Sequence, residues 1–306
     1  QTYVESIMGD KPMLILELDE HSADAGYITR LEAFADVLHS NPTQTVEWFE
    51  TAQTNSRMDA LGKKTLWVPP MGEPQPKLVA AALRNQGYNA KALPFETAEA
   101  FQMGRRETRG GECLPCPATF GTFLKSVEDS GENPNQHALF MPTASGPCRF
   151  GQYCTQNRIA LDRIGWEEIP VVSWSSTDSY DGLSTKGRRL FWWGLVLGDI
   201  LYKIRCRILP YEMEEGRTEK TYLKWLGCLE VAFEKGEKLE PVVEAMRDDF
   251  LAIPTTSVNK PLVGVVGEIY VRNNPFTNQN VVRRIEKAGG EAWLAPITEW
   301  VLYTAH

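Results

Sequence analysis

The chain has 306 residues, 42% of them apolar, and a formal net charge of −8. This length and apolar content are enough for two packed domains. The acidic balance argues against a nucleic-acid-binding surface, which is usually basic.

The longest apolar run, residues 190–197, is too short to span a bilayer. The first twelve residues lack the basic start and apolar centre of an export signal. We therefore expect a cytoplasmic protein and no membrane partner. Because the chain does not begin with Met and reaches an apolar run almost at once, we also expect it to be part of a longer polypeptide.

The first 62 residues are expected to be the end of a preceding α/β unit followed by a linker. Residues 13–18 (MLILEL) are an apolar run that predicts a buried strand. Thr29 can cap a helix whose apolar side chains recur at i, i+3 and i+4 through Leu38. Residues 40–62 show no clear period, which predicts a linker.

Strand–helix–strand units then recur along the chain. The first unit comprises residues 65–68, 76–86 and 89–93, the second 138–141, 156–164 and 170–174, and the third 262–266, 278–287 and 292–295. This repetition predicts an α/β fold of Rossmann-like parallel sheets with flanking helices. Right-handed crossovers would place the loops after Val68, Met141 and Val266 along one edge.

Between the second and third units the pattern becomes helical. Residues 186–208, 218–234 and 239–251 predict three helices, with Pro210 and Pro254 as breaks. The expected organisation is therefore a Rossmann-like domain over residues 63–182, a helical insertion over 183–253 and a C-terminal βαβ unit over 254–306.

Four of the six cysteines lie in two loops rich in Gly and Pro. Cys113 and Cys116 form a CxxC in GGECLPCP, and Cys148 and Cys154 lie in PTASGPCRFGQYC, between a predicted strand and a predicted helix. Ligands of parallel sheets usually bind in the crevice at such strand ends. Without an export signal, metal binding or catalysis is favoured over disulfides. We expect the two loops to meet and to hold an iron–sulfur cluster.

The residues alone leave three alternatives for these cysteines. Two short cysteine pairs also describe a zinc site. Buried free thiols are the second alternative, and the one favoured for Cys206 and Cys228, which lie inside helical patterns. The third is a redox dithiol at the CxxC. Cys113-Leu-Pro-Cys116 shows no clear helix start after a first strand, which argues against this alternative.

A second candidate region, residues 264–275 (GVVGEIYVRNNP), follows a predicted strand. It lacks the GxGxxG dinucleotide pattern, and the chain has no GxxxxGK[ST] motif. Glu268, Arg272 and Asn273 are expected to line the same crevice as the cysteines and to bind substrate. The alternative is helix capping by Asn side chains and Thr277.

Four stretches, residues 17–34, 111–116, 142–153 and 267–278, together resemble the 2-hydroxyacyl-CoA dehydratase superfamily. The resemblance is to the dehydratase-like portion of the large CoA-substrate-specific enzyme activase proteins. It implies a 4Fe–4S cluster in Rossmann-like domains, and low-potential electrons delivered by an ATP-dependent activase domain or subunit. It also implies an acyl-CoA substrate and a role in anaerobic metabolism. Oligomeric state is left open, with a homo-oligomer as one outcome.

The resemblance is specific to individual cysteines. Cys113 and Cys148 match cysteines of the family motifs, whereas Cys116 and Cys154 stand where many relatives have other residues. A related branch carries a double cubane on six cysteines, which would here recruit Cys206 and Cys228 as well. The expected function is an iron–sulfur module of a dehydratase-like lyase. The alternatives are a non-catalytic electron relay or scaffold within a larger activase protein, and a double-cubane reductase of small molecules.

Overall fold

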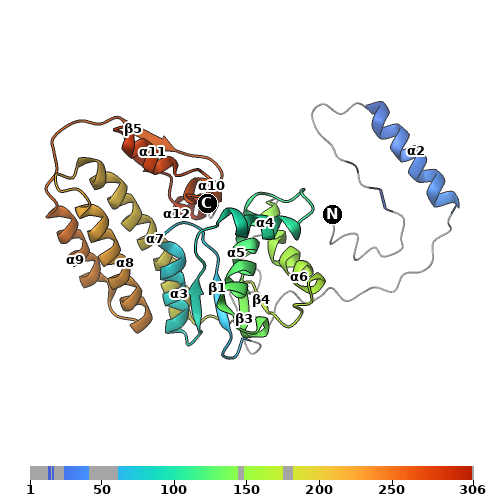
Figure 1. Cartoon of the computed structure of the whole chain (residues 1–306), viewed down its shortest axis with the longest axis horizontal. Coiled ribbons are helices and arrows are strands. Elements are labelled where there is room, and N and C mark those ends of the chain that lie inside the picture. The colour runs from blue at the N-terminus through green and yellow to red at the C-terminus, as the bar shows by residue number, and fades with distance from the viewer. Residues whose placement is uncertain are drawn as a thin grey trace. The chain divides into compact units, whose positions relative to one another are not determined.

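The computed structural model describes residues 13–14, 16, 24–40, 61–143, 148–174 and 182–304. The chain divides into two compact units, Gln1–Gln53 and Thr54–His306. In the first unit the main described element is helix α2 (Asp24–Ser40), which begins before the expected cap at Thr29 (Figure 1). Of the strand expected over residues 13–18, the described residues 13, 14 and 16 are not in a strand, and the others lie outside the described residues. Most of the expected linker also lies outside them.

A four-stranded parallel sheet forms the centre of the second unit and confirms the predicted α/β class (Figure 1). Its order is β2–β1–β3–β4, and the strands are β1 (Thr65–Val68), β2 (Ala90–Ala92), β3 (His137–Phe140) and β4 (Val171–Val172). Leu66 of β1 pairs with Ala90 on one side and with Ala138 on the other. From β1 the chain crosses to β2 on one side of it, and it then crosses back over β1 to form β3 on the other side. The carboxyl ends of β1 and β3 therefore border the switch-point crevice, where open α/β sheets bind ligands.

Four helices accompany this sheet: α3 (Gln75–Asn85), α4 (Ala98–Arg106), α5 (Pro115–Ser130) and α6 (Tyr153–Arg163). Two short 3₁₀ turns, η2 (Pro134–Gln136) and η3 (Arg149–Gln152), precede β3 and α6. Helices α4 and α5 are additional to the elements expected from the sequence. The expectation that Cys113-Leu-Pro-Cys116 does not begin a helix is wrong, because α5 begins at Pro115 with Cys116 in its first turn. Proline is favoured at this position, since the first helical N–H needs no intrahelical partner.

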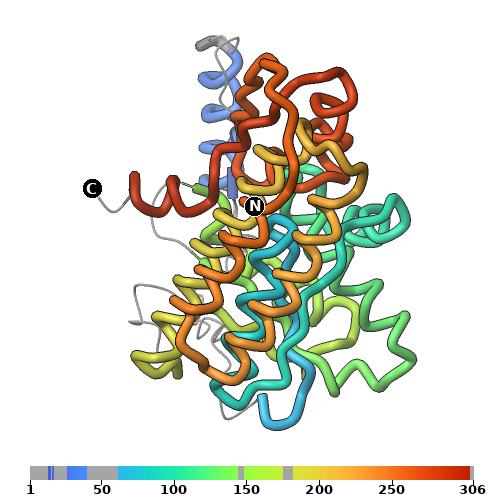
Figure 2. The backbone as a smooth tube through the Cα atoms, turned by 90° about the vertical axis from the view of Figure 1, so that its left-hand side faces the viewer, coloured from blue at the N-terminus to red at the C-terminus, as the bar shows by residue number. Residues whose placement is uncertain are grey.

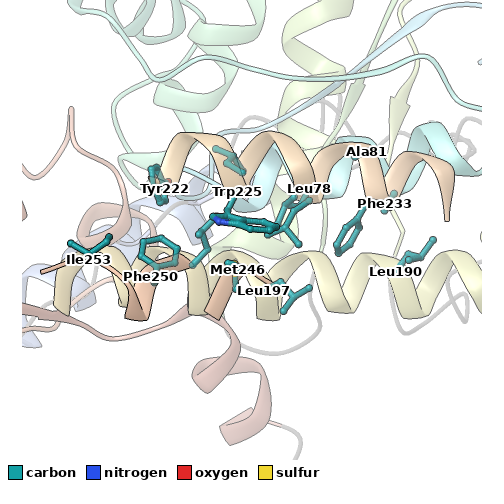
Figure 3. Close-up of a cluster of buried hydrophobic side chains, with 14 residues drawn as sticks. Leu78, Ala81, Leu190, Leu197, Tyr222, Trp225, Phe233, Met246, Phe250 and Ile253 are labelled. Carbon is teal, nitrogen blue, oxygen red and sulfur yellow. The ribbon is translucent and has the colours of Figure 1, made fainter. Parts of the chain in front are cut away.

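The predicted helical insertion consists of α7 (Thr185–Ile208), α8 (Arg217–Lys235) and α9 (Leu239–Leu251), with the 3₁₀ turn η4 (Leu209–Tyr211) after α7. Buried side chains of these helices and of α3 form one core, in which Leu78, Leu197, Trp225, Phe233 and Phe250 point toward one another (Figure 3). Among the residues that the structure describes, no helix is long and apolar enough to cross a membrane.

The C-terminal elements are β5 (Leu262–Val265), α10 (Ile269–Asn273), α11 (Val281–Lys287), β6 (Glu291–Leu294) and α12 (Ile297–Thr304). Strands β5 and β6 pair in parallel as a separate two-stranded sheet. The expectation that the loop after Val266 shares one sheet edge with the loops after Val68 and Met141 is therefore wrong. The physical reason is packing, because Ala292 of β6 and Val282 of α11 pack against Cys206 of α7 and not beside β4.

Buried Asp199 of α7 anchors the start of α12. Its carboxylate accepts hydrogen bonds from the backbone N–H groups of Ile297 (3.2 Å) and Thr298 (2.8 Å), and from the Thr298 hydroxyl (2.6 Å). Gln75 Nε2, at the start of α3, donates to the same carboxylate at 2.7 Å. The C-terminal elements consequently lie at the carboxyl end of the four-stranded sheet, as both backbone views show (Figures 1 and 2).

We predict that Gly121→Ala lowers the free energy of unfolding by about 1–3 kcal/mol, the usual cost of overpacking. A Cβ atom at Gly121 would lie 1.9 Å from the carbonyl oxygen of Ala100, because α4 and α5 cross in backbone contact there. Urea unfolding followed by circular dichroism measures this free energy.

The matched control is Gly227→Ala in the exposed part of α8, where an added Cβ meets nothing within 4 Å. Alanine is favoured over glycine inside a helix, so this variant should be neutral or stabilised by up to about 1 kcal/mol. Equal effects of the two substitutions would contradict the close crossing of α4 and α5.

Candidate functional site

The two cysteine loops lie next to each other at the carboxyl edge of the sheet. Arg149, directly after Cys148, donates from Nη1 to the carbonyl oxygen of Gly111 at 2.8 Å. The hydroxyl of Thr143, which follows β3, donates to the carbonyl oxygen of Gly151 at 3.0 Å and folds the second loop back. The segment that leads into α5 and the segment that leads into α6 are thus joined directly.

The four cysteines of these loops occupy two different environments. Cys148 is exposed and Cys113 is half-buried, whereas Cys116 and Cys154 are buried in an apolar core with Phe120 and other side chains. Burial, reinforced by the nearby Glu112 and Cys113, raises the pKa of the Cys116 thiol to about 12. Burial likewise raises the pKa of Cys154 to about 11. Both buried thiols are therefore protonated at neutral pH.

This arrangement fits the expected cluster ligands only in part. Cys113 and Cys148 are accessible, lie on adjoining loops and can act as thiolate ligands. Cys116 and Cys154 would have to leave the core and lose their protons. Within the described ranges, no three His, Cys, Asp or Glu side chains are grouped so that they could hold a metal ion. The same donors would serve a zinc site, so the geometry does not separate zinc from iron.

Tyr153 links the second loop to the first cysteine. Its side chain is 6% exposed, and its hydroxyl forms a hydrogen bond with Cys113. Burial raises the pKa of Tyr153, and the nearby groups Cys113, Cys116 and Glu268 raise it further. The neutral hydroxyl therefore donates to the Cys113 sulfur. The sequence signal for this role was its position at the end of the PTASGPCRFGQY stretch, where α6 begins.

The three residues expected to bind substrate all make local structural contacts. Glu268 caps α10 by accepting from the backbone N–H of Val271 at 2.8 Å. Arg272 donates to the carbonyl oxygens of Gly267 (2.8 Å), Ala295 (3.0 Å) and Pro296 (3.2 Å). Asn273 donates from Nδ2 to the carbonyl oxygen of Ile269 at 2.7 Å. Of the three, Glu268 is near enough to Tyr153 for its charge to contribute to the raised pKa of that hydroxyl. Their role in substrate binding stays a prediction.

Asn273 also lines a small cavity between α7 and the C-terminal elements. The cavity measures about 20 Å³ and is bordered by Gln75, Asp199, Lys203 and Cys206 among others. That volume holds about one water molecule. It is far too small for an acyl-CoA.

A buried carboxyl group that the sequence did not single out connects the end of β2 to α10. Glu96 is 5% exposed, and both the Tyr270 hydroxyl and the Asn274 side-chain amide hydrogen-bond to its carboxyl oxygens. Burial raises the pKa of Glu96 despite these hydrogen bonds. Nothing in the sequence distinguished it from other acidic residues after a strand. Its partners lie more than 170 positions away, at separations of 174 and 178 residues.

The raised pKa of Glu96 predicts that Glu96→Gln weakens the pH dependence of stability. The unfolded chain ionises this carboxyl near its ordinary pKa of 4.5, but the folded chain does so only at higher pH. The free energy of unfolding therefore falls as pH rises above 4.5. Glutamine resembles the protonated acid and does not ionise, so the variant should not show this fall in the free energy of unfolding. Urea unfolding of both chains at pH 5 and pH 8 measures the difference.

Glu96→Ala provides the matched control because it leaves Asn274 and Tyr270 without their buried partner. It should lower stability by about 1–3 kcal/mol at either pH. If Glu96→Gln retains the full slope between pH 5 and pH 8, then Glu96 is not the group that titrates.

Comparison with known proteins adds no assignment to this geometry. No protein-family model matches the chain, and the search of curated proteins found no match. The description of the site therefore rests on the contacts given above, and its function is argued from them.

Proposed function

We propose that this chain is the iron–sulfur module of a 2-hydroxyacyl-CoA dehydratase-like system in the cytoplasm. In this proposal it accepts low-potential electrons from an ATP-dependent activase. The observation that carries the proposal is the hydrogen bond from Arg149 to Gly111, which brings the Cys113 and Cys148 loops together. The two loops meet at the carboxyl edge of a parallel sheet, the usual ligand site of such folds. The four sequence stretches that resemble the superfamily include both loops.

The residues around Cys113 suit a bound cluster. Gly110 adopts a positive φ of 89°, and added Cβ atoms at Gly110 and Gly111 would meet nothing within 4 Å. These glycines therefore leave the backbone before Cys113 open to an approaching group. Such a cluster, when bound, would supply one-electron transfer at low potential.

The chain's own residues would then orient and stabilise the ligands. Arg149 holds the second loop against the first. The Tyr153 hydroxyl hydrogen-bonds to Cys113 and would orient it, as groups hydrogen-bonded to metal ligands usually do. Cys116 and Cys154 support both loops from the core, and they would complete a four-cysteine set only if the starts of α5 and α6 rearranged.

The positions of the remaining cysteines favour a single cluster over a double cubane. Cys206 is buried on α7 against α11 and β6, and Cys228 is exposed on α8. Neither is in the apolar core that contains Cys116 and Cys154. A six-cysteine cluster would require both helices to move.

The second candidate function is an electron relay or scaffold within a larger activase protein. It is favoured by the contacts of Glu268, Arg272 and Asn273, since each of these side chains forms a hydrogen bond within the chain. The relay needs the same two cysteines and the same activase partner but no acyl-CoA pocket. Turnover of acyl-CoA with an activase and ATP separates the two functions, since a relay would show none.

We predict that Cys113→Ser and Cys148→Ser each remove most of the bound iron. After anaerobic purification and reconstitution, the unmodified chain should hold about four iron and four sulfide per chain, the content of one cubane. Iron and acid-labile sulfide analysis measures both values. Circular dichroism should remain unchanged in the two variants, because neither cysteine is fully buried.

Cys228→Ser is the matched control, since Cys228 is exposed and lies on α8. It should retain the full iron content. Unchanged iron in Cys113→Ser and Cys148→Ser would overturn the proposed cluster site. A zinc content of one per chain without sulfide would replace it with a zinc site.

A further inference from the structure

Cys113 and Cys116 are joined by a tight turn at the beginning of α5. The backbone N–H of Cys116 donates to the carbonyl oxygen of Cys113 at 2.9 Å. Residues that close a turn of this kind have Cα atoms within about 7 Å of each other. Disulfides span Cα separations of about 4.4–6.8 Å. The backbone thus already holds the two cysteines at a separation suited to a disulfide.

The two thiols also differ in exposure in the way that thiol–disulfide exchange requires. Cys113 is half-buried and can be reached from solvent, whereas Cys116, three residues later, is only 1% exposed. An outside disulfide can therefore reach Cys113 first. Pro115 lies between them in the first turn of α5 and restricts the backbone, which helps to keep Cys113 accessible and Cys116 buried.

Of the other four cysteines, three lie in helices and one lies on the adjoining loop. Cys148 lies on the adjoining loop, Cys154 is in α6, Cys206 is in α7 and Cys228 is in α8. None of the six forms a disulfide in the described structure. The turn between Cys113 and Cys116 is therefore the best-placed site for a disulfide within one local segment.

We propose that Cys113 and Cys116 form a reversible disulfide by exchange with a small-molecule disulfide such as oxidised glutathione. The Cys113 thiolate attacks one sulfur, forms a mixed disulfide and releases one thiol. The Cys116 sulfur then attacks the mixed disulfide, passes its proton to the departing thiolate and closes the Cys113–Cys116 bond. Two cysteine thiols are oxidised with loss of two protons, and one small-molecule disulfide is reduced to two thiols.

This inference deepens the proposed function and rests on it for one consequence. A sulfur in a disulfide is no thiolate and cannot ligate iron, so oxidation would withdraw Cys113 from the cluster site. The disulfide would then act as a redox switch that permits cluster assembly only under reducing conditions. The formation of the disulfide itself requires no metal.

The test uses the full metal-free chain equilibrated anaerobically with mixtures of reduced and oxidised glutathione. Free thiols are alkylated, and disulfides are mapped by peptide mass spectrometry. We expect a Cys113–Cys116 disulfide whose fraction follows the glutathione ratio. Cys116→Ser should instead accumulate glutathione on Cys113, because the resolving thiol is missing. Cys154→Ser, which removes a similarly buried thiol outside the turn, should leave the disulfide unchanged.

Two results would overturn the inference. One is a disulfide between Cys113 and Cys148 in place of Cys113–Cys116. The other is full alkylation of Cys116 after unfolding at every glutathione ratio. A separate iron reconstitution of the oxidised and reduced chains tests the consequence. If the disulfide forms but neither chain binds iron, the proposed cluster function fails while the disulfide stands.

Discussion

Two buried carboxyl groups determine where the C-terminal elements lie. Asp199 receives four hydrogen bonds from Gln75, Ile297 and Thr298, and Glu96 is bonded by Tyr270 and Asn274. A buried carboxyl group is costly unless such partners satisfy it, so both contacts are expected to be maintained together. They connect α7 and the end of β2 to segments far along the chain. The Glu96 contacts hold α10 beside the segment after β2, and Glu268, directly before α10, contributes to the raised pKa of Tyr153.

The environment of each cysteine then decides which chemistry it can perform. Cys113 is half-buried and Cys148 is exposed, so both sulfurs can be reached from outside. Burial disfavours the thiolates of Cys116 and Cys154, as their raised pKa values indicate. Within each pair the two cysteines are at most six positions apart, yet one is accessible and the other belongs to the core. The division follows from the first turns of α5 and α6, each of which carries its second cysteine into the apolar core.

Metal binding and disulfide formation at Cys113 exclude each other, since both require the same sulfur. If Cys113 serves both, the redox state of the surroundings would decide whether a metal can bind before any electron is delivered to the site. Arg149 and Tyr153 contact this region from the second loop. Their contacts do not depend on Cys116, so the adjoining loops can remain in place in either state. The same geometry is compatible with a catalytic module and with an electron relay.

The sequence by itself determined the local elements and where the reactive residues fall along them. Apolar runs of four or five residues and the helical period located β1, β3, β5, β6 and α7–α9, because these patterns depend on neighbours along the chain. The position of Cys148 after a strand was readable for the same reason. Only the tertiary structure decided that β5 and β6 form their own sheet, that Cys116 and Cys154 are buried, and that Glu96 meets Tyr270 and Asn274. These features arise from contacts between residues as many as 178 positions apart, and no local pattern of residues encodes such pairings.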